Sequence, residues 1–348
     1  MASLFLLFLL INALLLLIVA AELPLDSESE MRKIVSLVNE ANIGWNATVY
    51  PKFARMSKNQ RKRLNGLAVM DPQQRAKQRK MAPETPLTLA LEKIPREFDS
   101  SVKWPKCAEV IRSIRDQSHC GDCWAVGAAS VYSDRLCIKS DGRIQVSASE
   151  IDIASCALGE GEDGCLGVED LSPGWEFIHK FGVVSGSGFR LRKGCKPYPF
   201  PPSNEAVDFF ATPVCEKKCF ENFTEKTYEQ DKLFGTPVVL QSSDNARMVQ
   251  LIQQEMIARG PVEVGFLVYT DFFSYHSGVY KHTWGSLEGA HAVKLVGWGV
   301  EKGEPYWLVA NSWGEDWGEH GFFRIRRGTN EAEFEGLVDP YASDPRVD

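Results

Sequence analysis

The chain contains nine cysteines, and an odd number cannot all be paired within one chain. Disulfides persist in the secretory pathway and outside the cell, whereas cysteines in the cytosol stay reduced. The compartment therefore decides whether the other eight cysteines cross-link the fold. The length of 348 residues is enough to bury the core of one large domain or of two modest ones.

The N-terminal sequence is typical of a secretory signal peptide. Residues 4–19 are almost unbroken apolar sequence, and two small alanines follow them. We predict cleavage near residue 21, so that residues 1–21 are removed. A membrane anchor is the alternative, because the run approaches the length that spans a bilayer. The glycosylation sequons at Asn46 and Asn222 fit the secretory route, and we expect an endolysosomal or extracellular protein without membrane attachment after cleavage.

Charge divides the rest of the chain into two parts. Residues 22–91 hold 12 Lys and Arg against 7 Asp and Glu, a net charge of +5, and no cysteine. Residues 92–348 hold 27 against 39, a net charge of −12, and all nine cysteines. This acidic part argues against a nucleic-acid partner. The basic run Lys58–Arg63 is typical either of a solvated helix face or linker, or of a detachable pro-segment on an oppositely charged domain, and charge alone leaves both open.

The segment Gln117–Gly127, with the sequence QSHCGDCWAVG, indicates nucleophilic chemistry. Small and apolar residues recur from Trp124 to Ile138 and predict a buried helix with Cys123 in its first turn. The positive end of the helix dipole should lower the pKa of the Cys123 thiol and favour the thiolate. A thiolate nucleophile needs a proton partner, and histidine is the natural one.

Among six histidines, His291 is the candidate for that partner. The alternation after it predicts a strand, which is a rigid place to hold an imidazole. Twenty residues on, Asn311 follows the strand-like sequence Tyr306–Val309. Its side-chain carbonyl could accept the imidazole N–H and fix the orientation of the ring.

These segments resemble, in order, the three active-site motifs of papain-like cysteine peptidases. The flanking sequences Lys193–Tyr198, Gly260–Glu263 and Pro305–Trp313 are similar to the cathepsin B branch in particular, and the resemblance runs from about Asn39 to the C-terminus. It implies an α+β fold of two subdomains. The left half would be helical and carry Cys123, the right half would be β-barrel-like, and the active-site cleft would lie between them.

The resemblance also implies a role for each site residue. Cys123 would be the nucleophile, His291 its proton partner and Asn311 the group that orients the imidazole. Gln117 would supply the oxyanion hole together with the Cys123 backbone N–H. Four residues would contact substrate or border its subsites: Gly167, Trp313, Glu335 and Ala290, with Glu335 at the base of the S2 pocket and Trp313 shielding the histidine–asparagine hydrogen bond.

The other eight cysteines would pair, by the same resemblance, as Cys107–Cys137, Cys120–Cys165, Cys156–Cys215 and Cys195–Cys219. A zinc site at Cys120–Cys123 lacks the second closely spaced ligand pair that such sites need, and we expect neither metal nor cofactor.

Several positions depart from the family pattern. Asp122 replaces a small residue before the nucleophile, where a carboxylate would raise the thiol pKa unless its side chain faces solvent. Ala290 replaces a glycine before the histidine, and Val168 replaces the second of two adjacent glycines beside the substrate. The stretch 196–214 is short and contains no histidine, whereas cathepsin B has a histidine-bearing loop that blocks the cleft. We therefore expect a more open cleft and endopeptidase action.

We predict that residues 22–92 are a pro-segment and residues 93–348 the mature peptidase domain. The best-matching stretch of the pro-segment is Val38–Ala47, and the resemblance implies that it lies along the cleft and silences a monomeric zymogen. Its partners would be protein or peptide substrates and its own pro-segment. The alternative function is a catalytically impaired homologue that binds peptides or partners, which Asp122 and Val168 motivate.

Overall fold

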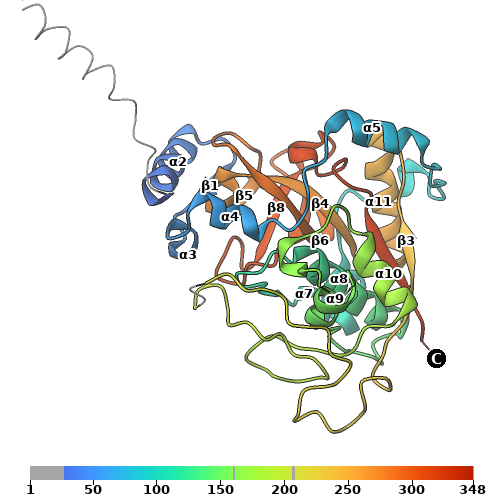
Figure 1. The fold of residues 1–348 in the computed structure, drawn as a ribbon. Helices are drawn as coiled ribbons and strands as arrows, with labels where there is room; N and C mark the ends of the chain where they lie inside the picture. Colours follow the sequence, from blue (N-terminus) through green and yellow to red (C-terminus); the bar gives the residue numbers. More distant parts are fainter. Residues whose placement is uncertain (1–26, 160, 206–207, 348) are drawn as a thin grey trace, which may run out of the picture.

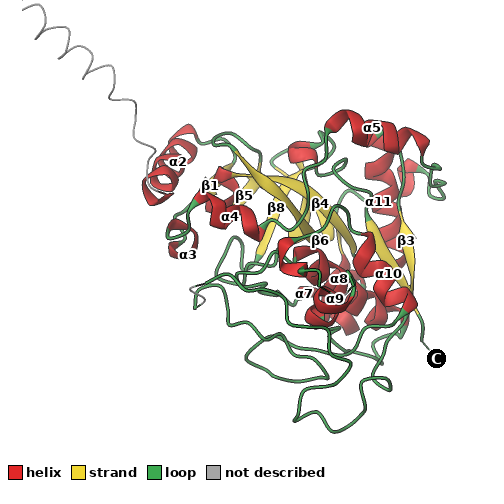
Figure 2. Ribbon diagram, viewed as in Figure 1, coloured by secondary structure: helices red, strands yellow, loops and turns green. Residues whose placement is uncertain are grey.

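The structure is a computed structural model that describes residues 27–159, 161–205 and 208–347. The predicted signal peptide, residues 1–21, lies outside the described residues. Helices α7 to α10, within residues 108–180, gather on one side of a long twisted sheet, and the helices of the N-terminal segment lie around the rest of it (Figures 1 and 2). This division agrees with a helical left half and a sheet-built right half. The sheet is not a closed barrel, because the order of its strands has two separate ends.

The helices fall into two groups along the chain. Those of the N-terminal segment, residues 27–92, are α2 (Ser27–Ala41), α3 (Pro51–Ala54), α4 (Lys58–Leu64) and α5 (Pro72–Met81). Those of the helical half are α6 (Ser100–Lys103), α7 (Ala108–Arg112), α8 (Cys123–Lys139), α9 (Glu150–Cys156), α10 (Ser172–Lys180) and α11 (Asn245–Arg259). Short 3-10 turns lie at Leu91–Lys93, Pro105–Cys107, Gly164–Leu166, Thr270–Ser274 and Glu331–Glu333.

The sheet has the strand order β1-β5-β8-β7-β6-β4-β9-β3, with β2 paired to β6 at one side of this path. Its strands are β1 (Trp45–Ala47), β2 (Phe98–Asp99), β3 (Gly235–Val239), β4 (Val262–Tyr269), β5 (Tyr275–Tyr280), β6 (Leu287–Glu301), β7 (Glu304–Ala310), β8 (Phe322–Arg326) and β9 (Tyr341–Pro345). Strand β6 is the long central strand, and it pairs antiparallel with both β4 and β7. The predicted helix after Cys123 and the predicted strands after His291 and before Asn311 are confirmed as α8, β6 and β7.

The first part of the N-terminal segment docks on the β5 edge of this sheet, and its helix α5 lies at the other side of the molecule near α11 (Figure 1). Strand β1 pairs antiparallel with β5, so the segment extends the sheet by one strand. The face of α2 that carries Met31, Ile34 and Val38 is buried, which is the three-and-four spacing of an amphipathic helix. The segment therefore shares the main apolar core of the molecule.

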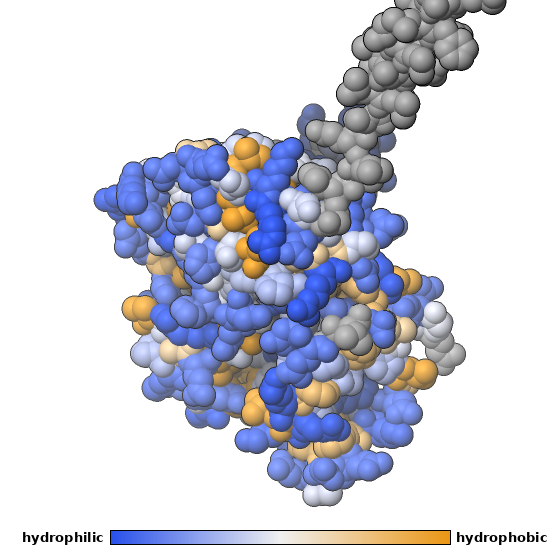
Figure 3. Space-filling model, turned by 90° about the vertical axis from the view of Figure 1, so that its left-hand side faces the viewer, coloured by the Kyte–Doolittle hydropathy of each residue, from blue (hydrophilic) through white to orange (hydrophobic). Residues whose placement is uncertain are grey.

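Four disulfides cross-link the helical half and its long loops. They join Cys107 to Cys137, Cys120 to Cys165, Cys156 to Cys215 and Cys195 to Cys219, the pairs that the family resemblance implies. Both sequon asparagines, Asn46 and Asn222, are exposed. The face seen in Figure 3 is mostly hydrophilic, with apolar side chains in small scattered groups. Within the described residues, no helix combines the length and the apolar character that crossing a membrane requires.

Candidate active site

Helix α8 places Cys123 at the boundary between the two halves. Cys123 is the first residue of the helix, and the indole N–H of the next residue, Trp124, donates to the Gly164 carbonyl at 3.1 Å. Cys123 is fully buried and is the free cysteine of the described chain. The odd cysteine of the sequence is therefore the one that the motif marks as a nucleophile.

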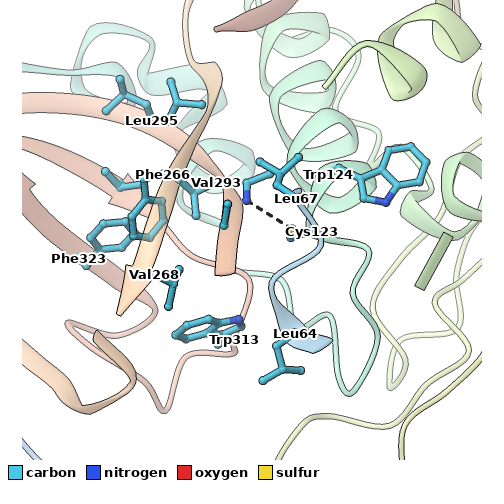
Figure 4. Packing of buried hydrophobic residues seen from close by; sticks show 14 of the residues in the cluster. Leu64, Leu67, Cys123, Trp124, Phe266, Val268, Val293, Leu295, Trp313 and Phe323 are labelled. Carbon is cyan, nitrogen blue, oxygen red and sulfur yellow. Dashed lines mark hydrogen bonds between the residues drawn. The ribbon is translucent and has the colours of Figure 1, made fainter. Parts of the chain in front are cut away.

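Strand β6 brings His291 to the thiol. The backbone N–H of Ala292 donates to Cys123 Sγ at 3.4 Å, so the strand passes directly beside the sulfur (Figure 4). His291 Nε2 lies 2.8 Å from Asn311 Oδ1, at the end of β7. A side-chain carbonyl only accepts, so Nε2 carries the proton of a neutral ring. His291 Nδ1 has no hydrogen-bond partner among the described residues, which leaves it free to serve the thiol.

An aromatic cluster covers the histidine–asparagine pair. The ring of Trp313 lies 5.0 Å from the ring of His291, and Trp313 stacks on Phe273 at 5.0 Å. Trp313 is 1% exposed, so water has little access to the hydrogen bond between His291 and Asn311. This is the shielding that the family resemblance implies for Trp313.

Gln117 points its amide into the site. Its Nε2 donates to the carbonyls of Leu64 at 2.9 Å and Cys120 at 2.7 Å. The hydroxyl of Ser312 donates to Gln117 Oε1 at 2.7 Å and fixes which end of the amide faces the cleft. The sequence reasoning did not single out Ser312, although its position next to Asn311 was a signal for it.

The N-terminal segment runs through the cleft over the sulfur. Residues Leu64 to Leu67 pass Cys123 in Figure 4. A Cβ added to Gly66 would lie 3.2 Å from Cys123 Sγ and would overlap the Gly121 carbonyl. The Gly66 carbonyl accepts from the Val168 N–H at 3.0 Å. Only a glycine fits this close passage of one backbone over another.

Burial sets the protonation of Cys123 and His291 in this covered site. Burial raises the pKa of the Cys123 thiol to about 12 and lowers the pKa of His291 to about 4. Both groups are then neutral near pH 7, because a charged form loses its hydration in a closed site. The prediction that the helix dipole would lower the Cys123 pKa is wrong for this covered state, in which the loss of water outweighs the dipole.

The predicted substrate-binding residues Gly167 and Ala290 both lie against the N-terminal segment. The Leu67 N–H donates to the Ala290 carbonyl at 3.0 Å, and a Cβ at Gly167 would come within 2.6 Å of the Gly66 carbonyl. The neighbouring Val168 accepts from the Ala68 N–H at 2.9 Å. The branched side chain of Val168 therefore leaves its backbone available for pairing with an extended chain.

Glu335 lies in a different environment from these residues. It is fully buried, and its Oε1 accepts from the Trp307 indole at 2.9 Å and from the Gly328 N–H at 2.7 Å. Burial raises the pKa of this carboxyl. The side chain of Leu67, by contrast, packs against Gly265, where an added Cβ would lie 2.8 Å from Leu67 Cδ1. A role for Glu335 at the base of a subsite stays a prediction.

Two basic side chains anchor the N-terminal segment. Lys52 is buried and contacts the Trp313 carbonyl and Asp316, whose Oδ1 is 2.7 Å from Lys52 Nζ. Arg61 is fully buried, 3.2 Å from the equally buried Glu288. The basic run is thus neither a linker nor a fully solvated face, and the sequence carried no signal that Arg61 would be buried.

The site holds the groups of a thiol–imidazole mechanism and no cluster suited to a metal. Within the described residues, no group of three or more His, Cys, Asp or Glu side chains has the arrangement of a metal site. The chemistry that the geometry offers is nucleophilic attack by sulfur.

Comparisons with known proteins agree with this geometry. Residues 94–338 match the family described as papain family cysteine protease. The cathepsin B-like cysteine proteinase 6 of Caenorhabditis elegans is 49% identical over 255 residues, which are 70% of this chain and 65% of that protein. The cathepsin B-like cysteine proteinase of Schistosoma japonicum is 39% identical over 327 residues, 90% of each chain.

The solved structure of proCathepsin B S9 from Trypanosoma congolense is also similar. Its TM-score is 0.73 at 33% identity, with 91% of this chain and 98% of that chain covered. Digestive procathepsin L 3 of Tenebrio molitor larval midgut shares the fold, with a TM-score of 0.63 at 19% identity over 92% of this chain and 89% of that one. The chain therefore belongs to the papain family of cysteine proteases, among the cathepsin B-like cysteine proteinases.

Proposed function

We propose that this chain is the zymogen of a cysteine endopeptidase of cathepsin B type that enters the secretory pathway. The observation that carries the proposal is the Cys123–His291–Asn311 arrangement with Gln117 beside it. Residues 22–92 are the inhibitory pro-segment in this proposal, and residues 93–348 the mature enzyme. Removal of residues 1–21 and a secreted or endolysosomal destination belong to the same proposal.

The pro-segment silences the enzyme by occupying the place of a substrate. Its Leu64 carbonyl accepts from the Gln117 amide at 2.9 Å, so it takes the donor that a reacting oxyanion needs. The Gly66 backbone covers Cys123 Sγ and excludes both water and substrate. When the segment leaves, water returns, and the thiol and imidazole regain the conditions for a thiolate–imidazolium pair.

The reaction then follows from the groups that are present. The Cys123 thiolate attacks a peptide carbonyl carbon, and the oxyanion that forms receives hydrogen bonds from Gln117 and from the Cys123 backbone N–H. The carbon–nitrogen bond breaks as His291 gives its proton to the leaving amine. Water, deprotonated by His291, attacks the thioester and releases the carboxylic acid, which restores the thiol–imidazole pair.

Endopeptidase action is favoured by the loop at 196–214. It has no histidine to bind a substrate carboxylate, and the hydroxyl and N–H of Ser203 tie it down to Asp116 Oδ2, both at 3.0 Å. Phe209 stacks on His119 at 5.1 Å and keeps the loop against the helical half. An extended chain can then pass through the cleft on both sides of Cys123.

The test is hydrolysis of an internally quenched peptide by the acid-processed protein. Cleavage that disappears in the Cys123→Ala variant supports the proposal. The second candidate, an impaired homologue that binds peptides, is motivated by Asp122 and Val168. Binding of the same peptide without cleavage at any pH would select that candidate and reject the first.

A further inference from the structure

Asp122 is a buried carboxyl group without a cation. It precedes the nucleophile, is fully buried and makes no side-chain cap to helix α8. Both of its oxygens lie within hydrogen-bond distance of one group, the Tyr198 hydroxyl, at 3.2 and 3.0 Å. Within the described residues no ion pair includes Asp122, and an isolated buried carboxylate is costly.

The hydrogen bonds of the Tyr198 hydroxyl require that Asp122 supply a proton. The Tyr198 hydroxyl also lies 2.8 Å from the Gln117 carbonyl, which only accepts. A hydroxyl has one proton, so Tyr198 cannot donate to Gln117 and to a carboxylate at once. Both contacts are satisfied only when Asp122 carries a proton and donates it to the Tyr198 oxygen.

We propose that Asp122 is held as a neutral carboxylic acid and acts through Tyr198 as a positioning residue for the oxyanion glutamine, Gln117. This inference rests on the proposed function for its catalytic consequence, but not for the protonation itself. The chain of donation runs from Asp122 to Tyr198 to the Gln117 carbonyl. It steadies the backbone of the residue whose side-chain amide faces the reacting carbonyl.

The charged surroundings favour the neutral acid. Glu150 of α9 faces both Asp122 and Tyr198, Asp116 faces Tyr198, and Glu263 of β4 faces Cys123. All three are acidic. Arg115, the cation that pairs with Glu150, forms no ion pair with Asp122 among the described residues.

Burial acts in the same direction as these charges. It raises the pKa of Asp122 well above its ordinary range and outweighs the hydrogen bond with Tyr198, which lowers this pKa, while the negative charge of Glu150 adds to the increase. Burial also raises the pKa of Tyr198, so the phenol keeps its proton.

Loss of the Asp122 proton would impair catalysis in two ways. A negative charge next to Cys123 raises the pKa of the thiol and opposes the oxyanion. Tyr198 would turn its proton to the new carboxylate, and the Gln117 carbonyl would lose that donor. Asp122 thus imposes an upper pH limit on peptide hydrolysis, which a small neutral residue at this position would not impose.

The first experiment reads the protonation directly in the full chain. An infrared difference spectrum between wild type and Asp122→Asn near pH 7 should contain the carbonyl band of a protonated carboxyl group. Other buried acids cancel in the difference. A carboxylate band in its place would overturn the proposal whether or not the protein hydrolyses peptides, so this result is independent of the proposed function.

The second experiment uses the acid-processed enzyme. The asparagine amide donates to Tyr198 but cannot ionise, so the fall of kcat/KM at alkaline pH should shift to higher pH in Asp122→Asn than in the wild type. Tyr198→Phe should lower kcat with little change in KM, because it disturbs Gln117 and not peptide binding. Identical pH profiles for Asp122→Asn and wild type would overturn the positioning role.

Discussion

The buried ion pair between Arg61 and Glu288 gives the sharpest prediction about how the zymogen stays closed. The guanidinium lies 3.2 Å from the carboxylate, and both side chains have 0% exposure. At an effective dielectric constant of about 20, two unit charges at this distance attract by about 5 kcal/mol. Arg61→Met leaves Glu288 buried without a cation, and breaking such pairs costs about 3–5 kcal/mol.

If the docking free energy of the N-terminal segment falls by about 3 kcal/mol, the fraction of zymogen molecules with an undocked segment rises about 100-fold. The assay is the rate at which an epoxide alkylates Cys123 in the full chain near pH 7, because only the open form exposes the sulfur. Lys62→Met is the matched control, since it removes a neighbouring positive charge that is exposed. Adding Glu288→Met to Arg61→Met should recover much of the loss, because the fully buried carboxylate is then removed together with its cation, and Glu30, the other carboxylate beside Arg61, is partly exposed. Equal labelling rates for Arg61→Met and Lys62→Met would refute the reasoning.

Three further predictions concern the same cleft. Gly66→Ala should open the zymogen because its Cβ would overlap the Gly121 carbonyl, and epoxide labelling of the full chain should exceed that of the exposed control Ala68→Gly. Hydrogen bonds, first among them that of the Ser243 N–H, lower the pKa of Glu84 to about 2, so Glu84 strengthens docking above about pH 4.5 and loses this effect as pH falls towards 2. In the chain whose catalytic cysteine is changed to alanine, Glu84→Gln should therefore speed removal of the N-terminal segment by an added protease near pH 6 but not near pH 2; a pH-independent effect would contradict this. The histidine-free loop predicts that amidated and free-acid peptides are cut at similar rates, and a strong preference for the free acid would disprove it.

Local sequence patterns were sufficient to place the chemical groups. The small and apolar run after Cys123 predicted helix α8, and alternation predicted the strands that carry His291 and precede Asn311. These features depend on neighbours in the sequence, so a reading of local periodicity captures them. The disulfide pairs came only from the family resemblance, since spacing alone permits many connectivities.

The closure of the site and the protonation of Cys123 depend on contacts between segments that are distant in the sequence. Gly66 lies over Cys123 only because the N-terminal segment docks, and this closure reverses the expected pKa shift of the thiol. Arginine is a residue type that is mostly exposed, and Arg61 can be buried because Glu288 of β6 forms an ion pair with it. Likewise, the motif showed Asp122 as an unusual residue, but only the fold showed Tyr198 above it.

The central claim is that Cys123 is the nucleophile of a peptidase and that residues 22–92 keep it covered. Its most direct test is mass-spectrometric mapping of epoxide labelling on the same preparation, before and after acid processing. We predict little label on Cys123 in the full chain, stoichiometric label on Cys123 once the segment is removed, and none in Cys123→Ala. Label-free Cys123 after complete removal of the segment, at every pH tried, would contradict the account.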